Sequence, residues 1–315
     1  MKLYGNEKTV EDFKREFSAG KLSHAFIIEG ERGSGRLTLS RTLASILTGE
    51  RERTMTGNHP DVHELLFLER TGQIKIDDIR DIIKQAFVVP VESEYNIFII
   101  ENAQMMGQAA QNALLQIFEE PPQNTLFFLL STDKNLLLKT LLSRARVLKT
   151  EKLSKETIKA ILEERFPERA DRVERVATLA QGFLGAALEI MSDEGIFEAL
   201  DFVDSYMGLV SDRASVFELS KLFSPVVQKQ ISRQTLSLRV SYLAKALRDV
   251  VLVGFSDASP CYFDSAHVPQ KIAETMGQKR ALMLFDMCSD ILSRVNSLNV
   301  SCAIANLNSH FARQS

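Results

Sequence analysis

The chain has little of what cross-links or anchors a protein from outside its fold. Its three cysteines, Cys261, Cys288 and Cys302, are an odd number, lie far apart and form no C-x-x-C pair. This usage argues against a disulfide framework and a zinc site, and it favours a reducing cytoplasm. Residues 1–20 show no apolar core of a signal peptide, and no run approaches the roughly 18 apolar residues that span a bilayer. We therefore expect a cytoplasmic protein with no membrane segment.

An excess of positive charge is also absent. The 38 Lys and Arg residues are set against 41 Asp and Glu residues, which gives a formal net charge of −3. Proteins that bind nucleic acid by themselves usually show a basic domain or stripe, so strong direct DNA binding by this chain alone is disfavoured. What is present is an ordinary globular composition, 45% hydrophobic and 25% charged, in 315 residues. That length is typical of about two or three domains.

Strand-like and helix-like segments alternate over the first half of the sequence. The clearest strand is residues 96–102, where the apolar residues Ile97 to Ile100 run directly into Glu101. The candidate strands are residues 25–28, 62–68, 96–102, 126–132 and 145–148, and the candidate helices are residues 38–47, 76–87 and 107–120. Five strands with helical crossovers predict a doubly wound parallel sheet, with any ligand near the carboxyl ends of the strands.

The pattern changes near Thr150, and the rest of the chain is helical in its apolar spacing. Leu236, Val240, Leu243 and Leu247, for example, share one helical face. We therefore predict an α/β fold followed by all-α structure. The expected domains are an α/β domain over residues 1–152, a small helical domain over 153–208 and a helical C-terminal domain over 209–315.

A glycine-rich loop, Gly30-Glu31-Arg32-Gly33-Ser34-Gly35-Arg36-Leu37, follows the first candidate strand. It has the position and the glycines of a phosphate-binding loop, whose working pattern is G-x-x-x-x-G-K-[ST]. In that pattern the lysine reaches the phosphates and the hydroxyl holds Mg²⁺, but here these positions hold Arg36 and Leu37. A guanidinium is a bulky planar fork, and leucine offers no oxygen to a metal ion. The loop indicates a nucleotide-binding fold that has lost its chemistry.

Several further segments occur in an order that is typical of one family. They are Leu22–Phe26 before the loop, Gly57–Asp61, Asn112–Pro122 with the letters NALLQIFEEPP, Leu129–Ala145 with Ser143-Arg144-Ala145, Gly182–Leu188, and Leu247–Leu252. With these motifs the chain resembles the bacterial clamp-loader branch of the AAA+ ATPases, most strongly over residues 20–150. The resemblance implies an AAA+ domain, a helical lid and a helical collar that joins subunits, over the three ranges given above.

The resemblance also implies a degenerate nucleotide pocket. Glu101 stands where the family has a metal-side aspartate, and Asn102 where active members have a glutamate that orients water; an amide cannot take up a proton as that carboxylate can. Ala186 stands where an arginine would reach the γ-phosphate. The expected pocket residues are Gly30, Gly33, Ser34, Gly35, Arg36, Leu37, Glu101, Asn102, Thr132 and Ala186. We expect no hydrolysis in this pocket and no bound cofactor. The family's four zinc-binding cysteines are absent before Gly57, so we expect no zinc module.

One functional element of the family is kept, in Ser143 and Arg144. In the family this arginine acts in trans and completes the ATP site of a neighbouring subunit. The resemblance therefore implies a non-hydrolysing subunit of a DNA polymerase III clamp loader. Its expected partners are tau/gamma-type ATPase subunits and delta, and indirectly the sliding clamp and primer–template DNA.

Several alternatives stay open at this stage. Arg36 is either a solvated surface residue or the partner of Glu101, and Arg144 is either an ordinary exposed arginine or the trans finger. His59 and His63 are four residues apart, but Pro60 and the strand-like stretch after it break the helical geometry of a metal pair, which favours packing or surface histidines. The rival functions are a divergent phosphate-loop ATPase that uses Arg36 and, against the net charge, a DNA-binding module.

Overall fold

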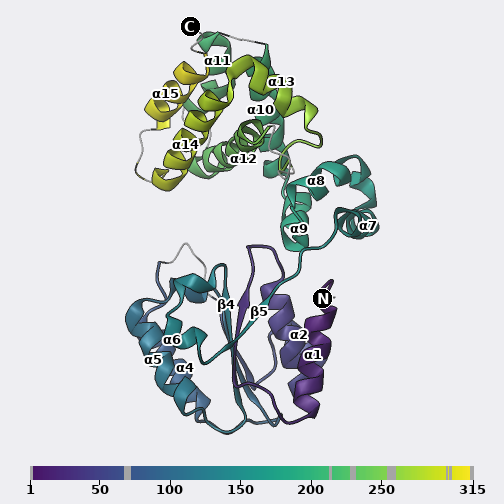
Figure 1. Ribbon diagram of the computed structural model, residues 1–315, viewed down its shortest axis with the longest axis vertical. Helices are drawn as coiled ribbons and strands as arrows, with labels where there is room; N and C mark the ends of the chain where they lie inside the picture. Colours follow the sequence, from purple (N-terminus) through teal and green to yellow (C-terminus); the bar gives the residue numbers. More distant parts are fainter. Residues whose placement is uncertain are drawn as a thin grey trace. The chain divides into compact units, whose positions relative to one another are not determined.

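The computed structural model describes residues 3–66, 72–212, 215–227, 232–253, 260–295, 297 and 300–312. Contacts between residues divide the chain into two units (Figure 1). The N-terminal unit contains the residues up to Ser154 together with Phe183–Ala186, and the C-terminal unit contains Lys155–Gly182 and the residues from Ala187 onward. The further division of residues 153–315 into a lid and a collar stays a prediction.

The N-terminal unit is built on a five-stranded sheet. Its strands are β1 Ala25–Glu29, β2 Val62–Leu65, β3 Asn96–Ile100, β4 Thr125–Ser131 and β5 Arg146–Lys149, in the order β2-β3-β4-β1-β5. Every neighbouring pair is parallel, which confirms the predicted doubly wound sheet. The second strand ends at Leu65, and residues 67–68 of the predicted strand lie outside the described residues.

Helices cover both faces of this sheet (Figure 1). On one side lie α1 Glu7–Ser18 and α2 Arg36–Thr48, and on the other α4 Ile76–Ala86, α5 Gln108–Glu119 and α6 Lys139–Leu142. A short helix, α3 Arg51–Thr56, follows α2. Because both faces are covered, the central strands are apolar along nearly their whole length instead of alternating.

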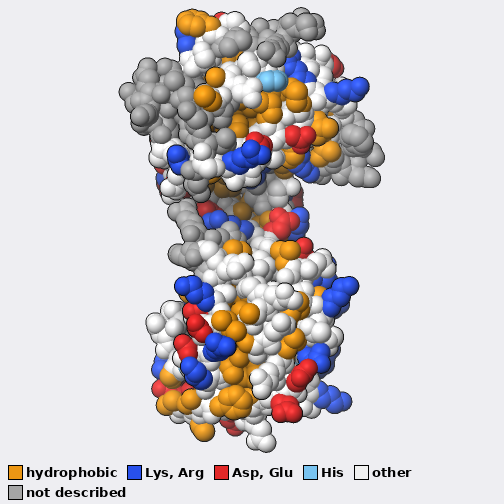
Figure 2. All heavy atoms as spheres, turned by 90° about the vertical axis from the view of Figure 1, so that its left-hand side faces the viewer, with side chains coloured by type: hydrophobic (Ala, Val, Ile, Leu, Met, Phe, Trp, Pro, Cys, Tyr) orange, Lys and Arg blue, Asp and Glu red, His pale blue; other side chains and the backbone are white. Residues whose placement is uncertain are grey.

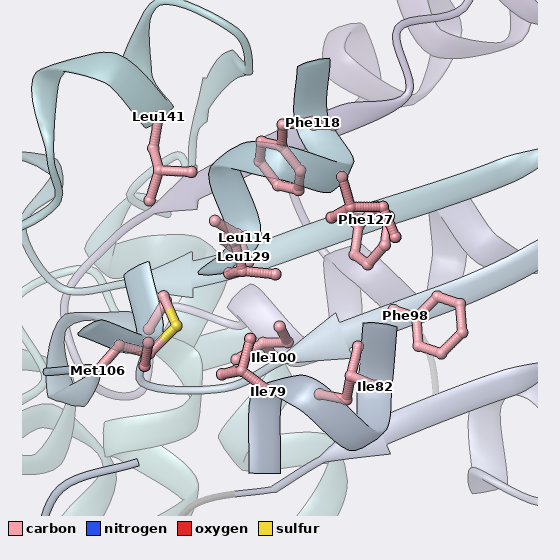
Figure 3. Close-up of a cluster of buried hydrophobic side chains, with 14 of the residues drawn as sticks. Ile79, Ile82, Phe98, Ile100, Met106, Leu114, Phe118, Phe127, Leu129 and Leu141 are labelled. Carbon is pink, nitrogen blue, oxygen red and sulfur yellow. The ribbon is translucent and has the colours of Figure 1, made fainter. Parts of the chain in front are cut away.

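Each face of the sheet has its own hydrophobic cluster. On the α4–α5 side, Phe98, Ile100, Phe127 and Leu129 of the sheet meet Ile79, Ile82, Leu114 and Phe118 of the helices (Figure 3). On the α2 side, Phe26, Ile28 and Phe128 pack with Leu39 and Leu43. These clusters fix the strands, and with them the polar segments that follow the carboxyl ends of β1, β3 and β4.

The C-terminal unit is helical. Its helices are α7 Lys155–Arg165, α8 Val173–Leu179, α9 Leu184–Ser192 from Ala187 onward, α10 Glu194–Ser211, α11 Val216–Val227, α12 Arg233–Val251, α13 His267–Met276, α14 Gln278–Arg294 and α15 Val300–Ala312, with a 3₁₀ segment at Pro167–Arg172. Among the described residues, no helix combines the length and the apolar character that a membrane crossing requires.

A buried carboxylate organises part of this helical unit. Asp249 of α12 accepts hydrogen bonds from the backbone N–H groups of Cys261, Tyr262 and Phe263 at 2.8–3.1 Å. The Tyr262 hydroxyl lies 2.7 Å from a carboxylate oxygen of Asp204 in α10, and Arg175 of α8 bonds both of these side chains. This network ties α8 to α10, which explains why residues 155–182 group with the C-terminal helices.

Candidate functional site

The glycine loop lies between β1 and α2, as its sequence predicts. The Gly30 N–H donates to the Ser131 carbonyl at 3.0 Å, and a Cβ at Gly30 would overlap the side chain of Thr150. Gly33 and Gly35 have φ of +80° and +83°, values that side chains other than hydrogen disfavour. The Ser34 N–H closes a turn on the Glu31 carbonyl at 3.1 Å. The glycines therefore define the shape of the loop.

The middle of the loop is fixed by the first turn of α9. The Gly185 N–H donates to the Gly33 carbonyl at 2.9 Å. A Cβ on Gly33 would lie 2.6 Å from the Ala186 nitrogen, and a Cβ on Gly185 would lie 2.6 Å from the Gly33 oxygen. The structure thus brings Ala186 against the loop, through its backbone and its methyl group.

The structure buries Arg36 and packs Leu37 against apolar side chains, at the two loop positions that differ from the phosphate-loop pattern. Arg36, at the start of α2, is 8% exposed, so the solvated alternative for this residue is wrong. Leu37 packs against the hydrophobic cluster on the α2 face of the sheet, which contains Phe26 and Leu39. A partly buried apolar side chain thus stands at the position where the phosphate-loop pattern has a hydroxyl.

The pairing of Arg36 with Glu101 stays a prediction. Glu101 follows β3, and its backbone N–H donates to the Leu65 carbonyl at 3.0 Å. Its carboxylate also acts on Arg41 of α2. The hydrogen bonds that Arg41 donates to the Glu64 carboxylate are the largest cause that raises the pKa of Arg41. Burial opposes them, and the charge of Glu101 adds to the rise.

Asn102 and Thr132 come together at the carboxyl ends of β3 and β4. Asn102 is 8% exposed and has left-handed backbone angles, φ 52° and ψ 45°. The Gln104 amide nitrogen donates to Asn102 Oδ1 at 3.4 Å, and the Thr132 N–H donates to Gln104 Oε1 at 3.3 Å. Gln104 therefore bridges the two predicted residues. Gln104 was not among the predicted residues, although it is a polar residue within four positions of the end of a buried strand.

A second arginine lies on the other side of the sheet from the glycine-loop helix. Arg144 follows α6 and Ser143, and its side chain is 36% exposed. Its Nη2 donates to Glu119 Oε1 at 2.8 Å, and its Nη1 donates to the Thr140 carbonyl and to Ser143 Oγ at 3.2 and 3.3 Å. The Ser143 hydroxyl donates in turn to the Thr140 carbonyl at 3.0 Å. Two separate sequence motifs therefore meet at the Arg144 guanidinium.

Two lysines lie beside Glu29, the residue directly before Gly30, which was not among the predicted site residues. A Glu29 carboxylate oxygen accepts from the Lys134 N–H at 3.3 Å. The side-chain nitrogens of Lys134 and Lys149 lie 3.7 and 3.5 Å from the other oxygen. Glu29 thus links the start of the loop to the segment that leads from β4 towards α6.

One group of described residues has donor atoms close enough to suggest a metal site: Glu50, His59 and Glu92, all within 4.8 Å of one another. Arg53 Nη1 already bonds Glu50 and Glu92 at 3.1 and 2.5 Å, and it supplies the positive charge. His59 is buried, and its Nδ1 accepts the Asp61 N–H at 3.2 Å. This arrangement gives the group a structural explanation.

His63 also serves packing. Its ring stacks on Phe98 with 4.8 Å between centroids, and burial lowers its pKa.

The similarity to known proteins is clearest in the N-terminal unit. Residues 5–154 match the family model described as "DNA polymerase III, delta subunit". DNA polymerase III subunit gamma/tau of Mycobacterium tuberculosis H37Rv is 30% identical over 172 residues, which are 51% of this chain and 30% of that protein. Subunit gamma of Buchnera aphidicola from Schizaphis graminum is 30% identical over 207 residues, 60% of this chain and 56% of that protein. The chain thus spans about a third to about half the length of these two relatives.

A solved structure extends the likeness of the fold to nearly the whole chain. It is the DNA polymerase III gamma subunit-related protein of Thermotoga maritima, with a TM-score of 0.57 and 21% identity, covering 96% of this chain and 98% of that one. The similarity at this identity concerns the fold alone, a parallel sheet with helices on both faces followed by a helical part. Residues 5–154 thus match a family model of DNA polymerase III subunits, and their parallel sheet, with a glycine loop after β1, agrees with that match.

Proposed function

We propose that the chain is a delta-prime-like, non-hydrolysing subunit of a bacterial DNA polymerase III clamp loader. It would assemble in the cytoplasm with tau/gamma-type ATPase subunits and delta, with its C-terminal helices forming part of the collar. The assembly would load the sliding clamp onto primer–template DNA. The family match over residues 5–154 supports this proposal, and so do the relatives that are named as DNA polymerase III subunits.

The observation that carries the proposal is the contrast between the two arginines. Arg36, in the chain's own loop, is buried beside Leu37 in place of a lysine and a hydroxyl, while Arg144 lies half-exposed at the end of α6. A trans arginine stabilises the charge on a transferring phosphoryl group, and in GTPases it is worth roughly 10³–10⁵ in rate. Only an arginine that is accessible at the surface of its own domain can contact the phosphate of a neighbouring subunit.

The test uses the complex reconstituted with tau/gamma and delta. The Arg144→Ala protein should assemble normally, because the bonds of Arg144 to Thr140, Ser143 and Glu119 lie at the surface of its own domain. The DNA-stimulated ATPase activity of its complex should fall strongly. Failure of the wild-type chain to assemble would count against the whole proposal, whereas normal ATPase activity with Arg144→Ala would count against the finger alone.

A second candidate, a divergent ATPase, is favoured by one observation: the loop keeps the left-handed glycines of a phosphate-binding loop. Asn102 speaks against it, because an amide cannot serve as the proton acceptor near the attacking water. Titration of the isolated chain with ATP, with and without Mg²⁺, separates the two functions. Tight, magnesium-dependent binding followed by turnover would favour the divergent ATPase.

A further inference from the structure

We propose that Glu119 is a positioning residue that holds Arg144 in a resting place until the phosphate of a neighbouring subunit displaces it. This inference rests on the proposed trans role of Arg144. The Glu119 side chain is 54% exposed, and its Oε1 lies 2.8 Å from Arg144 Nη2. The two residues are 25 positions apart in the sequence, on α5 and after α6, so the contact is made by the fold and not by one helix.

Glu119 stands in a locally unfavourable position. It is the last residue of α5, where the helix presents unsatisfied carbonyl groups and the negative end of its dipole. A carboxylate there is disfavoured unless a cation lies beside it. Arg144 is that cation, which gives Glu119 a reason to be present that helix formation does not provide.

Arg144 can exchange its ion pair with Glu119 for one with a phosphate. An exposed ion pair is weak, because water solvates both charges well. A phosphate carries more negative charge than a carboxylate, and it accepts two parallel hydrogen bonds from a guanidinium fork. Arg144 can therefore give up Glu119 for a phosphate while its Nη1 bonds to Thr140 and Ser143 keep the side chain anchored at the end of α6.

The side of the N-terminal unit that carries α5 and α6 has features of a surface that binds another protein. Hydrophobic side chains gather on the side of the N-terminal unit where α4, α5 and α6 lie, and they are bordered by basic and acidic side chains (Figure 2). On such a surface a bare arginine would attract anions indiscriminately. Glu119 neutralises its charge until the correct phosphate arrives.

The experiment compares Glu119→Gln with Glu120→Gln in the reconstituted complex. Both variants remove one exposed carboxylate from the same end of α5, but among the described residues it is Glu119 that pairs with Arg144. We expect Glu119→Gln to raise kcat/KM for ATP about two- to five-fold, because a neutral amide holds the guanidinium less strongly. Glu120→Gln should leave kcat/KM at the wild-type value. A fall in kcat/KM with Glu119→Gln would show that Glu119 orients the finger productively, and it would overturn the resting contact.

A second measurement uses the isolated chain and does not depend on the complex. Phenylglyoxal modifies accessible arginines, and the rate at Arg144 can be followed on its peptide by mass spectrometry. Glu119→Gln should accelerate this modification at least two-fold, and Glu120→Gln should not. Equal rates in the two variants would overturn the inference even if Arg144→Ala abolishes ATPase activity. Unchanged ATPase activity with Arg144→Ala would instead refute the finger role, while the labelling still decides the contact.

Discussion

Arg36 and Arg144 lie in the same unit but have opposite surroundings. Arg36 is enclosed at 8% exposure at the start of α2, beside a leucine that packs into the core. Arg144 is 36% exposed, and its guanidinium is held by a single carboxylate and two local oxygens. A phosphate could displace the contacts of Arg144 at little cost, whereas Arg36 is held within its own domain.

The difference teaches that loop shape and loop chemistry are separable. The glycine loop has positive φ angles at Gly33 and at Gly35, the second glycine of the phosphate-loop pattern. Yet its central glycine is packed against the backbone of Gly185 and Ala186. The loop therefore packs against the first residues of α9, and Arg144 lies on a different part of the unit.

The largest effect on the free energy of unfolding is expected at Gly33. An alanine at Gly33 or at Gly35 adopts a left-handed conformation that costs roughly 1–2 kcal/mol. Only at Gly33 does the new methyl group also overlap the Ala186 nitrogen, whereas at Gly35 it meets no described atom within 4 Å beyond the adjacent residues and the backbone of its own helix. Gly33→Ala should therefore lower the free energy of unfolding by about 1–3 kcal/mol more than Gly35→Ala. Urea unfolding measures both, and equal losses would show that the loop does not pack on α9.

A substitution at the opposite end of the sheet should change the stability of the fold without changing the glycine loop or Arg144. Asp61, 2% exposed before β2, accepts the N–H groups of Val91, Glu92 and Ser93 at 2.6–2.9 Å. We expect Asp61→Asn to reduce the free energy of unfolding by about 1.5–3 kcal/mol, because it removes a charged acceptor. The ATPase activity of the assembled complex should stay at the wild-type value below the unfolding temperature.

The same residue predicts a pH dependence. Burial by itself raises the pKa of Asp61, but the three backbone donors outweigh it and the net pKa is lowered. A lowered pKa gives stabilisation that is present above the unfolded value of 3.8 and is lost as pH falls through the folded value. The stability difference between wild type and Asp61→Asn should therefore shrink below about pH 4. A difference that stayed constant from pH 7 to pH 3 would contradict this account of the three hydrogen bonds.

The smallest effect is expected from restoring the loop residues alone. The double variant Arg36→Lys/Leu37→Thr recovers the G-x-x-x-x-G-K-[ST] pattern, but Asn102 and Ala186 remain. We expect no ATP turnover by the isolated chain, because the water-orienting carboxylate is still missing. The reference is the wild-type chain at the same temperature, since Leu37→Thr also removes a core contact. Magnesium-dependent hydrolysis would show that only the loop had been lost.

The sequence predicted the sheet well, and the reasons are physical. Buried parallel strands are short apolar runs, and Ile97–Ile100 and Leu126–Leu130 stand out against their polar ends. The helix Glu7–Ser18 was not predicted, although Phe13 is buried in the cluster on the α2 face of the sheet. Val10, Phe13 and Phe17 follow helical spacing in this mostly polar segment and pack on that cluster, so the periodic signal was present in the sequence.

The candidate sites were predicted in part. The loop, Asn102, Thr132 and Arg144 followed from motif order, because each lies in a segment with a recognisable pattern. The contacts that define their state were not predictable in this way. Glu119 beside Arg144 and Gly185 against Gly33 join segments 25 and 152 positions apart, and local periodicity carries no information on such pairings.

The most direct test of the central claim compares two neighbouring arginines in the reconstituted complex. Arg146, two residues after Arg144, is also partly exposed and also forms an ion pair, with Glu16. The account predicts that Arg144→Ala lowers the DNA-stimulated ATPase rate by on the order of 10²-fold or more at the neighbouring site. Arg146→Ala should leave the rate within about two-fold of the wild type, the small change expected for a surface ion pair. Equal rates for the two variants would contradict the claim that this chain acts through Arg144 on the ATP of a partner.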